Sequence, residues 1–263
     1  MRLAALLLVA FITMPALAQQ GTETVAPLTV TVGANHAPPY RILNGGKESG
    51  LYIDIFRKIA DRLGWEVIYR EAPFRRVLRM MQMGEVDIML GPLRTPERES
   101  MMAFVAPAFP PERKLFFYTD ESDRITRYSD LDGKRIGVLE GASYFHRFDT
   151  DDQLQKESAP RYKNLMLMMQ KDRVDVVIAP ELVGIYTVNN LDMAVSISPF
   201  FVPGERSYIA VAKNSPVLDY ADDIRAALKL IKHEGVYEDL ILRYMERREP
   251  EGRISGSGSA GEL

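Results

Sequence analysis

The sequence predicts an α/β fold built from two similar halves, and three observations lead to that prediction. Between residues 28 and 90, short β-rich segments alternate with helical segments in the order β-α-β-α-β. The same alternation begins again near residue 115. Such alternation is typical of parallel sheets that are covered by helices. The chain has 263 residues, which suffices for one large domain or for two smaller ones.

The first half contains predicted elements in the order strand, helix, strand, helix, strand. Apolar side chains recur at helical spacing in residues 52–63, and Gly64 follows as a signal that ends a helix. Gly84 ends the second predicted helix in the same way. The expected elements are the strand 28–33, the helix 52–63, the strand 65–69, the helix 74–83 and the strand 86–90.

Two loops at the ends of these strands are where we expect functional side chains. Pro38 and Pro39 exclude a helix in residues 35–40 and force an extended loop. The second loop, residues 91–98, begins with Gly-Pro and follows the third strand. Ligands on parallel sheets bind beyond the carboxyl ends of the strands, so both loops are candidates for ligand contact.

The second half repeats the pattern and ends in helices. The Gly/Ser-rich end of the chain, residues 251–263, is expected to be disordered. The expected elements are the strand 115–118, the turn 131–134, the strand 135–139, the helix 165–170, the strand 174–179, a helix from Glu181, the strand 208–212 and the helices 217–233 and 237–247.

Composition excludes several classes of function. The chain has no cysteine, which excludes disulfides, cysteine-ligated metal sites, a thiol nucleophile and the lipid-modified cysteine of a bacterial lipoprotein. Lys and Arg number 33 against 36 Asp and Glu, giving a formal net charge of −3. Nucleic-acid binding needs a basic surface, so we expect no nucleic-acid partner.

The first residues have the pattern of a secretory signal peptide. Arg2 precedes an uncharged apolar run, Leu3–Met14, and Ala16–Ala18 (ALA) forms a cleavage site. The alternative is a membrane anchor, but the run is shorter than the roughly 20 residues that span a bilayer. We therefore expect residues 1–18 to be a signal peptide, cleaved after Ala18, and the mature protein to be periplasmic.

Six short segments together resemble the motifs of one protein family. They are Gly50–Ile55 (GLYIDI), Gly84–Asp87 (GEVD), Thr95–Arg98 (TPER), Leu131–Val138 (LDGKRIGV), Val174–Ile178 (VDVVI) and Gly235–Tyr237 (GVY). Their order is similar to that in the polar-amino-acid-type periplasmic solute-binding proteins, which are family 3 of the bacterial extracellular solute-binding proteins. Members deliver ligands to ABC importers. The resemblance implies a protein that captures a small carboxylate-bearing solute, such as an amino acid or a derivative, and passes it to an ABC permease in the inner membrane.

The resemblance also implies a two-lobed periplasmic-binding-protein fold of type II. Two three-layer α/β lobes would be joined by a two-strand hinge and would close on the ligand. Lobe one would comprise residues 27–111 and 209–250, and lobe two residues 117–203. The chain would cross between the lobes near residues 112–116 and 204–208. We expect a monomer without cofactor or metal.

Two residues are the main candidates for ligand contact by this resemblance. In the family, an arginine at the position of Arg98 binds the ligand's α-carboxylate, and an aromatic side chain at the position of Phe74 stacks on the ligand. A guanidinium presents parallel N–H donors that match a carboxylate, and an aromatic wall orients a ligand and excludes water. The alternatives are a surface arginine paired with Glu97 or Glu99 and a core phenylalanine at the start of a helix.

Four further positions match ligand-contact positions of the family. Gly91 matches a backbone carbonyl that accepts from the ligand's ammonium. Leu93 stands where a Ser or Thr hydroxyl is usual, and Ala142 stands where a Thr is common. Ser143 lies one residue further and offers a hydroxyl and a backbone N–H. The departures at these positions leave the identity of the ligand open.

The largest departure concerns the ligand's ammonium group. Pro180 stands where the family has an aspartate that binds it, and Glu181 follows. Either Glu181 takes that role or the ligand has no α-ammonium, and Glu181 is otherwise an acid at a helix N-terminus. Leaving a buried ammonium without a counter-charge costs about 3–5 kcal/mol, so the affinity for an amino acid depends on which alternative holds. His36, in the loop of residues 35–40, is a further candidate for ligand contact. The alternative is that its side chain does not point into the cleft.

Two other functions are possible on the same fold. One is a ligand-sensing periplasmic module for a membrane receptor. The other is an enzyme similar to the periplasmic cyclohexadienyl dehydratases, whose acid lies in a D-x-x-E segment after the second V-D strand. Here Glu181 stands in that segment but Gly184 occupies the fourth place, so the spacing does not match. We therefore expect a binding protein without catalytic residues.

Overall fold

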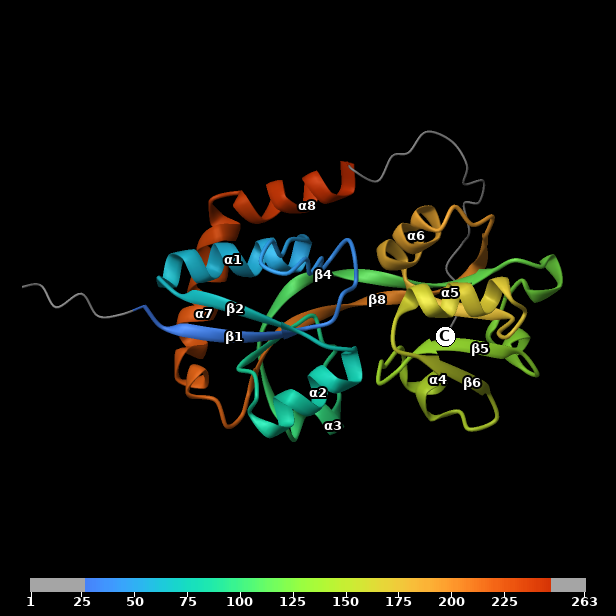
Figure 1. Cartoon of the computed structure of the whole chain (residues 1–263), viewed down its shortest axis with the longest axis horizontal. Coiled ribbons are helices and arrows are strands. Elements are labelled where there is room, and N and C mark those ends of the chain that lie inside the picture. The colour runs from blue at the N-terminus through green and yellow to red at the C-terminus, as the bar shows by residue number, and fades with distance from the viewer. Residues whose placement is uncertain (1–26, 247–263) are drawn as a thin grey trace, which may run out of the picture.

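An eight-stranded mixed sheet runs through the described part of the molecule, with helices packed along both of its faces (Figure 1). The structure is a computed structural model that describes residues 27–246. The predicted signal peptide of residues 1–18 and the predicted tail of residues 251–263 lie outside the described residues. No helix within residues 27–246 is long and apolar enough to cross a membrane.

The strands follow the order β2-β1-β3-β8-β4-β7-β5-β6 across the sheet. Their bounds are Thr29–Ala34 (β1), Glu66–Glu71 (β2), Ile88–Leu90 (β3), Met102–Tyr118 (β4), Arg135–Leu139 (β5), Gln155–Ala159 (β6), Val176–Pro180 (β7) and Ser196–Ala212 (β8). Strands β1, β2 and β3 pair in parallel, and so do β5, β6 and β7. Each parallel set forms one half of the molecule, which confirms the predicted alternation of strands and helices.

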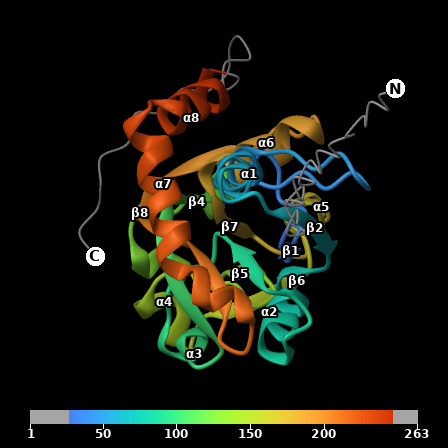
Figure 2. The ribbon, with the colours of Figure 1, turned by 90° about the vertical axis from the view of Figure 1, so that its left-hand side faces the viewer.

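The helices cover the two halves separately. Their bounds are Leu51–Leu63 (α1), Phe74–Met83 (α2), Pro96–Glu99 (α3), His146–Thr150 (α4), Tyr162–Gln170 (α5), Glu181–Asn190 (α6), Ala221–His233 (α7) and Val236–Glu246 (α8), with 3₁₀ turns at Glu121–Asp123, Tyr128–Leu131 and Pro216–Tyr220. In the first half, α1 and α8 lie above β1 and β2 and α2 lies below them, as Figure 1 shows. Viewed from that end, α7 and α8 stand in front of the sheet (Figure 2). Helix α7 packs against both α1 and α8.

The two-lobed α/β fold is confirmed, and the two halves are joined by β4 and β8. These strands have 17 residues each and pair antiparallel with one another. The pairing of Glu112 with Glu205 lies in the middle of the joined strands, inside the predicted crossings. The lobe boundaries stay a prediction.

Strands β4 and β8 are much longer than the sequence predicts. The expected strands, residues 115–118 and 208–212, are only their ends. Prolines interrupt the strand pattern at Pro107, Pro110 and Pro111 in β4 and at Pro199 and Pro203 in β8. Proline is tolerated in a sheet at edges and bulges, and the β4–β8 register shifts between Ala106 and Phe109 and again between Phe109 and Glu112. The prolines therefore mark irregular pairing rather than strand ends.

Both glycine-terminated helices are confirmed. Helix α1 ends at Gly64, with a φ of 66°, and α2 ends at Gly84, with a φ of 70°. This left-handed conformation favours glycine, which explains why the helices stop there. The short helix α4 and the polar strand β6 were not predicted, because residues 155–159 (QKESA) lack the β-branched and aromatic side chains that indicate a strand.

Candidate ligand-binding cleft

A cleft lies between the two halves and is lined by the loops that follow β1, β3 and β5 and by the end of β7. Its empty space is about 730 Å³, part of which is open to solvent. The lining includes six of the predicted site residues, namely Phe74, Gly91, Leu93, Arg98, Ala142 and Ser143. The structure thus brings these positions together at the carboxyl ends of the strands, and their contact with a ligand stays a prediction.

Arg98 connects the two halves across this cleft. It lies in α3, where the hydroxyl of Thr95 accepts a hydrogen bond from the Arg98 backbone N–H at 3.3 Å and caps the helix. Its Nη1 donates to the carbonyl of Leu93 at 3.0 Å. Its Nη2 donates to the carbonyl of Gly141 at 3.0 Å and to Oγ of Ser143 at 3.3 Å. The guanidinium is therefore held by the loop after β3 and by the loop after β5.

The side chain of Arg98 is buried, with 4% of its surface exposed. Burial lowers the pKa of Arg98, and the negative charges of Glu97 and Asp149 oppose that shift. No ion pair found among the described residues includes Arg98. Glu99 instead pairs with Arg94. The arrangement does not fit the alternative of a surface arginine paired with its neighbours.

Phe74 forms one wall beside this guanidinium. It is the first residue of α2, is 8% exposed, and has its ring centroid 5.5 Å from Cζ of Arg98. A cation over an aromatic face at this distance is attracted by the ring's electrons. Phe74 therefore helps to position Arg98 as well as lining the cleft.

Gly91 allows a close approach of side chains at the end of β3. Its φ is 89°, and a Cβ at this position would lie 2.5 Å from Cε2 of Tyr52 and 2.8 Å from Nη1 of Arg41. Arg41 is 7% exposed and donates from Nη1 to the carbonyl of Leu90 at 3.0 Å. It also donates to the backbone and side-chain oxygens of Asn35, at 3.2 and 3.0 Å. A second buried guanidinium thus lines the cleft, fixed by neutral oxygens.

Charged side chains of β4 enter the cleft from the strands that join the halves. Glu112 and Lys114 lie two residues apart and both line it, as does Glu205 of β8. The carboxylate of Glu112 accepts a hydrogen bond from the backbone N–H of Leu182 at 2.6 Å, near the N-terminus of α6, and another from the Tyr40 hydroxyl. Burial nonetheless raises the pKa of Glu112 to about 7, because desolvation outweighs these bonds.

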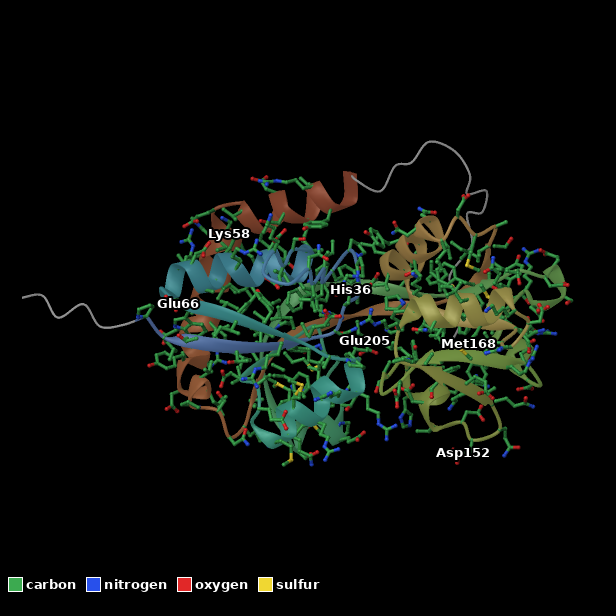
Figure 3. All side chains as sticks on the ribbon, in the orientation of Figure 1. His36, Lys58, Glu66, Asp152, Met168 and Glu205 are labelled. Atoms are coloured by element: carbon green, nitrogen blue, oxygen red, sulfur yellow. The ribbon has the colours of Figure 1, made fainter. Side chains whose placement is uncertain are left out.

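Two predicted site residues lie outside the lining of this cleft. Glu181 is engaged by Arg113, whose Nε and Nη2 donate to its two oxygens at 2.9 and 2.8 Å. Pro180, by contrast, does line the cleft. His36 lines a neighbouring groove, and its Nδ1 accepts from the backbone N–H of Leu43 at 3.2 Å. Figure 3 places His36 and Glu205 in the middle of the molecule, between the two halves.

Sequence reasoning missed four charged residues of the cleft, Arg41, Glu112, Lys114 and Glu205. A signal for two of them is present, because residues 112–114 (ERK) interrupt an apolar strand at the predicted crossing. Alternate strand residues point to the same face, so Glu112 and Lys114 share one face and Arg113 the other. Arg41 has no comparable signal, since one arginine after a Pro-Pro-Tyr turn is equally typical of a surface loop.

The comparisons with known proteins agree with this geometry. A family model described as bacterial extracellular solute-binding proteins, family 3, matches residues 29–247. The chain belongs to this family. The match covers both halves of the sheet and confirms the resemblance that the six motifs predict.

Individual relatives are distant but match nearly the whole chain. A probable histidine-binding protein of Campylobacter jejuni is 24% identical over 259 residues, covering 90% of this chain and 96% of that protein. A protein of Shewanella frigidimarina that is named as a sensor is 24% identical over 244 residues, covering 91% of this chain but 35% of that protein. The solved structure of an ancestral arginine-binding protein bound to arginine has a TM-score of 0.72 at 25% identity, covering 82% of this chain and 97% of that chain.

Proposed function

We propose that this protein is a periplasmic solute-binding protein that captures a small carboxylate-bearing solute, an amino acid or a derivative, and delivers it to an ABC importer. The solute would bind between lobe one, residues 27–111 and 209–250, and lobe two, residues 117–203. Membership of the family supports the role, and the names of relatives that bind histidine or arginine support an amino acid or a similar compound.

The observation that carries the proposal is the buried Arg98 in the cleft. It contacts backbone and side-chain oxygens of both halves and forms no ion pair within the described residues. A buried charge is normally paired, so a ligand carboxylate is the partner that its donors would favour. Because Gly141 and Ser143 hold the same guanidinium, binding at Arg98 would be coupled to the approach of the two lobes.

The proposal includes export and a free, unanchored carrier. Cleavage after Ala18 would release the mature chain into the periplasm, where we propose that it acts as a monomer and meets the inner-membrane permease. We propose no catalytic reaction. Turnover of prephenate or arogenate by the mature protein would contradict that part of the proposal.

The test is the affinity of an Arg98→Ala variant for the solute that the wild type binds. Mature protein, unfolded and refolded to remove bound solute, is titrated calorimetrically with amino acids and small carboxylates. Removing one partner of a buried charge pair costs about 2–5 kcal/mol, so Arg98→Ala should weaken binding at least about 30-fold. Arg76→Ala, on the exposed face of α2, is the control and should bind as the wild type does. Unchanged affinity in a folded Arg98→Ala variant would refute the assignment.

A second candidate is a sensing role, because the sensor relative matches 91% of this chain while it is a much longer protein. Stimulation of ATP hydrolysis by a permease–ATPase complex, reconstituted from any such genes adjacent to this one, distinguishes a carrier from a sensing module. A carrier loaded with its solute increases ATP hydrolysis by such a complex. A sensing module does not, and binds a membrane receptor instead.

A further inference from the structure

The described part of the chain has three buried basic side chains, and all three line the ligand-binding cleft. They are Arg41, Arg98 and Lys114, with 7%, 4% and 5% of their surfaces exposed. None of them takes part in an ion pair found among residues 27–246. Burying a cation without a counter-charge is unfavourable, so three such groups around one cleft need a common explanation.

Lys114 is the most informative of the three. It lies in the second half of β4, where it pairs with Pro180 of β7 on one side and with Val202 of β8 on the other. No hydrogen bond of its Nζ to a described residue is found, although the ammonium has three donors. Burial lowers the pKa of Lys114. The residue is buried but its Nζ stays accessible from the cleft, and such an ammonium is suited to an anionic group of a ligand.

Arg41 extends the positive region on the side of β1 and β3. Its hydrogen bonds to Asn35 and Leu90 use neutral oxygens, which orient the guanidinium without cancelling its charge. The ring of Tyr52 lies 5.4 Å from Cζ of Arg41 and supports one face. Arg41 is thus a fixed positive charge in the same cleft as Glu112 and Lys114 of β4.

The counter-charges in the cleft are too few to balance these groups. The negative residues of the lining are Glu112 and Glu205, and Glu205 is exposed to solvent. Asp149 is not part of the lining but adds a negative charge near Lys114 and Arg98, and both of its oxygens also accept from the backbone N–H of Tyr144 at 3.1 Å. The lining itself holds three positive and two negative side chains, an excess of one positive charge before any ligand carboxylate is added.

We propose that the cleft selects solutes with two acidic groups, one held by Arg98 and the second by Lys114 with Arg41. The inference rests on the proposed function, since it concerns the same cleft, and names the substrate class as small dicarboxylates. An acidic amino acid and a dicarboxylate without an amino group share this chemistry. A zwitterion with a neutral side chain would satisfy Arg98 but would leave the excess positive charge of the lining uncompensated.

Calorimetric titration with isosteric pairs tests the proposal. The probes are L-glutamate and L-glutamine, L-aspartate and L-asparagine, glutarate as a dicarboxylate without an amino group, and L-arginine as a cationic solute. The wild type should bind at least one dicarboxylate 10-fold or more tighter than the matching amide, and tighter than arginine. Glutarate against glutamate then shows whether the α-ammonium contributes.

A variant of Lys114 tests whether this side chain produces the preference for dicarboxylates over amides. Lys114→Met keeps the length of the side chain and removes its charge, and it should weaken dicarboxylate binding on the order of 100-fold while the affinity for the amide changes little. Lys58→Met, on the exposed face of α1 (Figure 3), is the matched control and should not change either affinity. If Lys114→Met does not fold, the wild-type preference for acid over amide decides alone.

Each contrary result has a distinct meaning. Equal or tighter binding of glutamine, asparagine or arginine overturns the dicarboxylate proposal and leaves the carrier function standing. A preference for acids that survives in folded Lys114→Met overturns the role of Lys114 and with it the proposal. Failure to bind any amino acid or carboxylate overturns both the proposal and the proposed function.

Discussion

Replacing Glu112 by glutamine should change how the stability of this protein depends on pH. Glu112 lies in the cleft, half-buried on β4, where burial raises its pKa from 4.5 to about 7. The charge of Glu181 adds to this shift, while the hydrogen bonds from Tyr40 and Leu182 and the charge of Lys114 oppose it. Glutamine keeps an oxygen that can accept from Leu182 but cannot ionise.

The expected magnitude follows from proton linkage. The folded state holds the Glu112 proton more tightly than the unfolded chain, so its contribution to stability is fully present below pH 4.5 and is lost as the pH rises to about 7. One pKa unit corresponds to about 1.4 kcal/mol, so the shift corresponds to about 3 kcal/mol. In the glutamine variant this pH-dependent loss of stability does not occur, because the amide does not ionise. Its free energy of unfolding relative to the wild type should therefore rise by about 3 kcal/mol between pH 4.5 and pH 8.

Urea unfolding of the two proteins at several pH values measures this difference. Taking the difference at each pH cancels the other titrating groups, which both proteins share. An increase of 2–4 kcal/mol that is complete by about pH 8 agrees with the reasoning. A difference that stays constant over this range would refute it, because Glu112 would then titrate alike in the folded and unfolded states.

Three further substitutions test the geometry around Arg98. Gly91→Ala should destabilise the protein by about 1–3 kcal/mol in urea unfolding and weaken solute binding, because the new Cβ would lie 2.5 Å from the ring of Tyr52 at a φ of 89°. Thr95→Ala removes the cap of α3 and should cost about 1 kcal/mol of stability, with a several-fold loss of affinity in calorimetry as Arg98 loses its support. Phe74→Leu should preserve most of the stability but weaken binding about 3- to 10-fold, since the aromatic face beside Arg98 is lost; equal affinity would show that the ring only fills space.

Much of the fold could be predicted because local signals and tertiary structure agree. The glycines after α1 and α2 adopt the left-handed conformation that ends a helix, and the βα alternation gives the two parallel sets of strands. The lengths of β4 and β8 could not be predicted. Prolines normally interrupt strands, and only the pairing of two distant segments with shifted register shows that the strands continue.

The candidate site likewise contains residues that could be predicted from the sequence and residues that could not. Arg98, Gly91 and Ser143 follow strand ends, so their convergence was predictable from the topology of parallel sheets and from the family motifs. Lys114 was not, because a lysine on a strand is more often exposed, and this one lies where β4 pairs with both β7 and β8. Glu181 is predicted either to bind the ligand's ammonium or to be an acid at a helix N-terminus, and its bidentate pairing with Arg113 is a tertiary contact that no local pattern indicates.

A thermal-shift screen of the mature protein tests the central claim, that the cleft binds a carboxylate-bearing solute, most directly. The screen compares amino acids, small carboxylates and polyamines. At a concentration of 100 times Kd, a bound solute should add about 2.7 kcal/mol of stability. We predict that stabilisation is confined to solutes with at least one carboxylate and is lost in Arg98→Ala. Stabilisation by polyamines without any carboxylate effect would contradict the account.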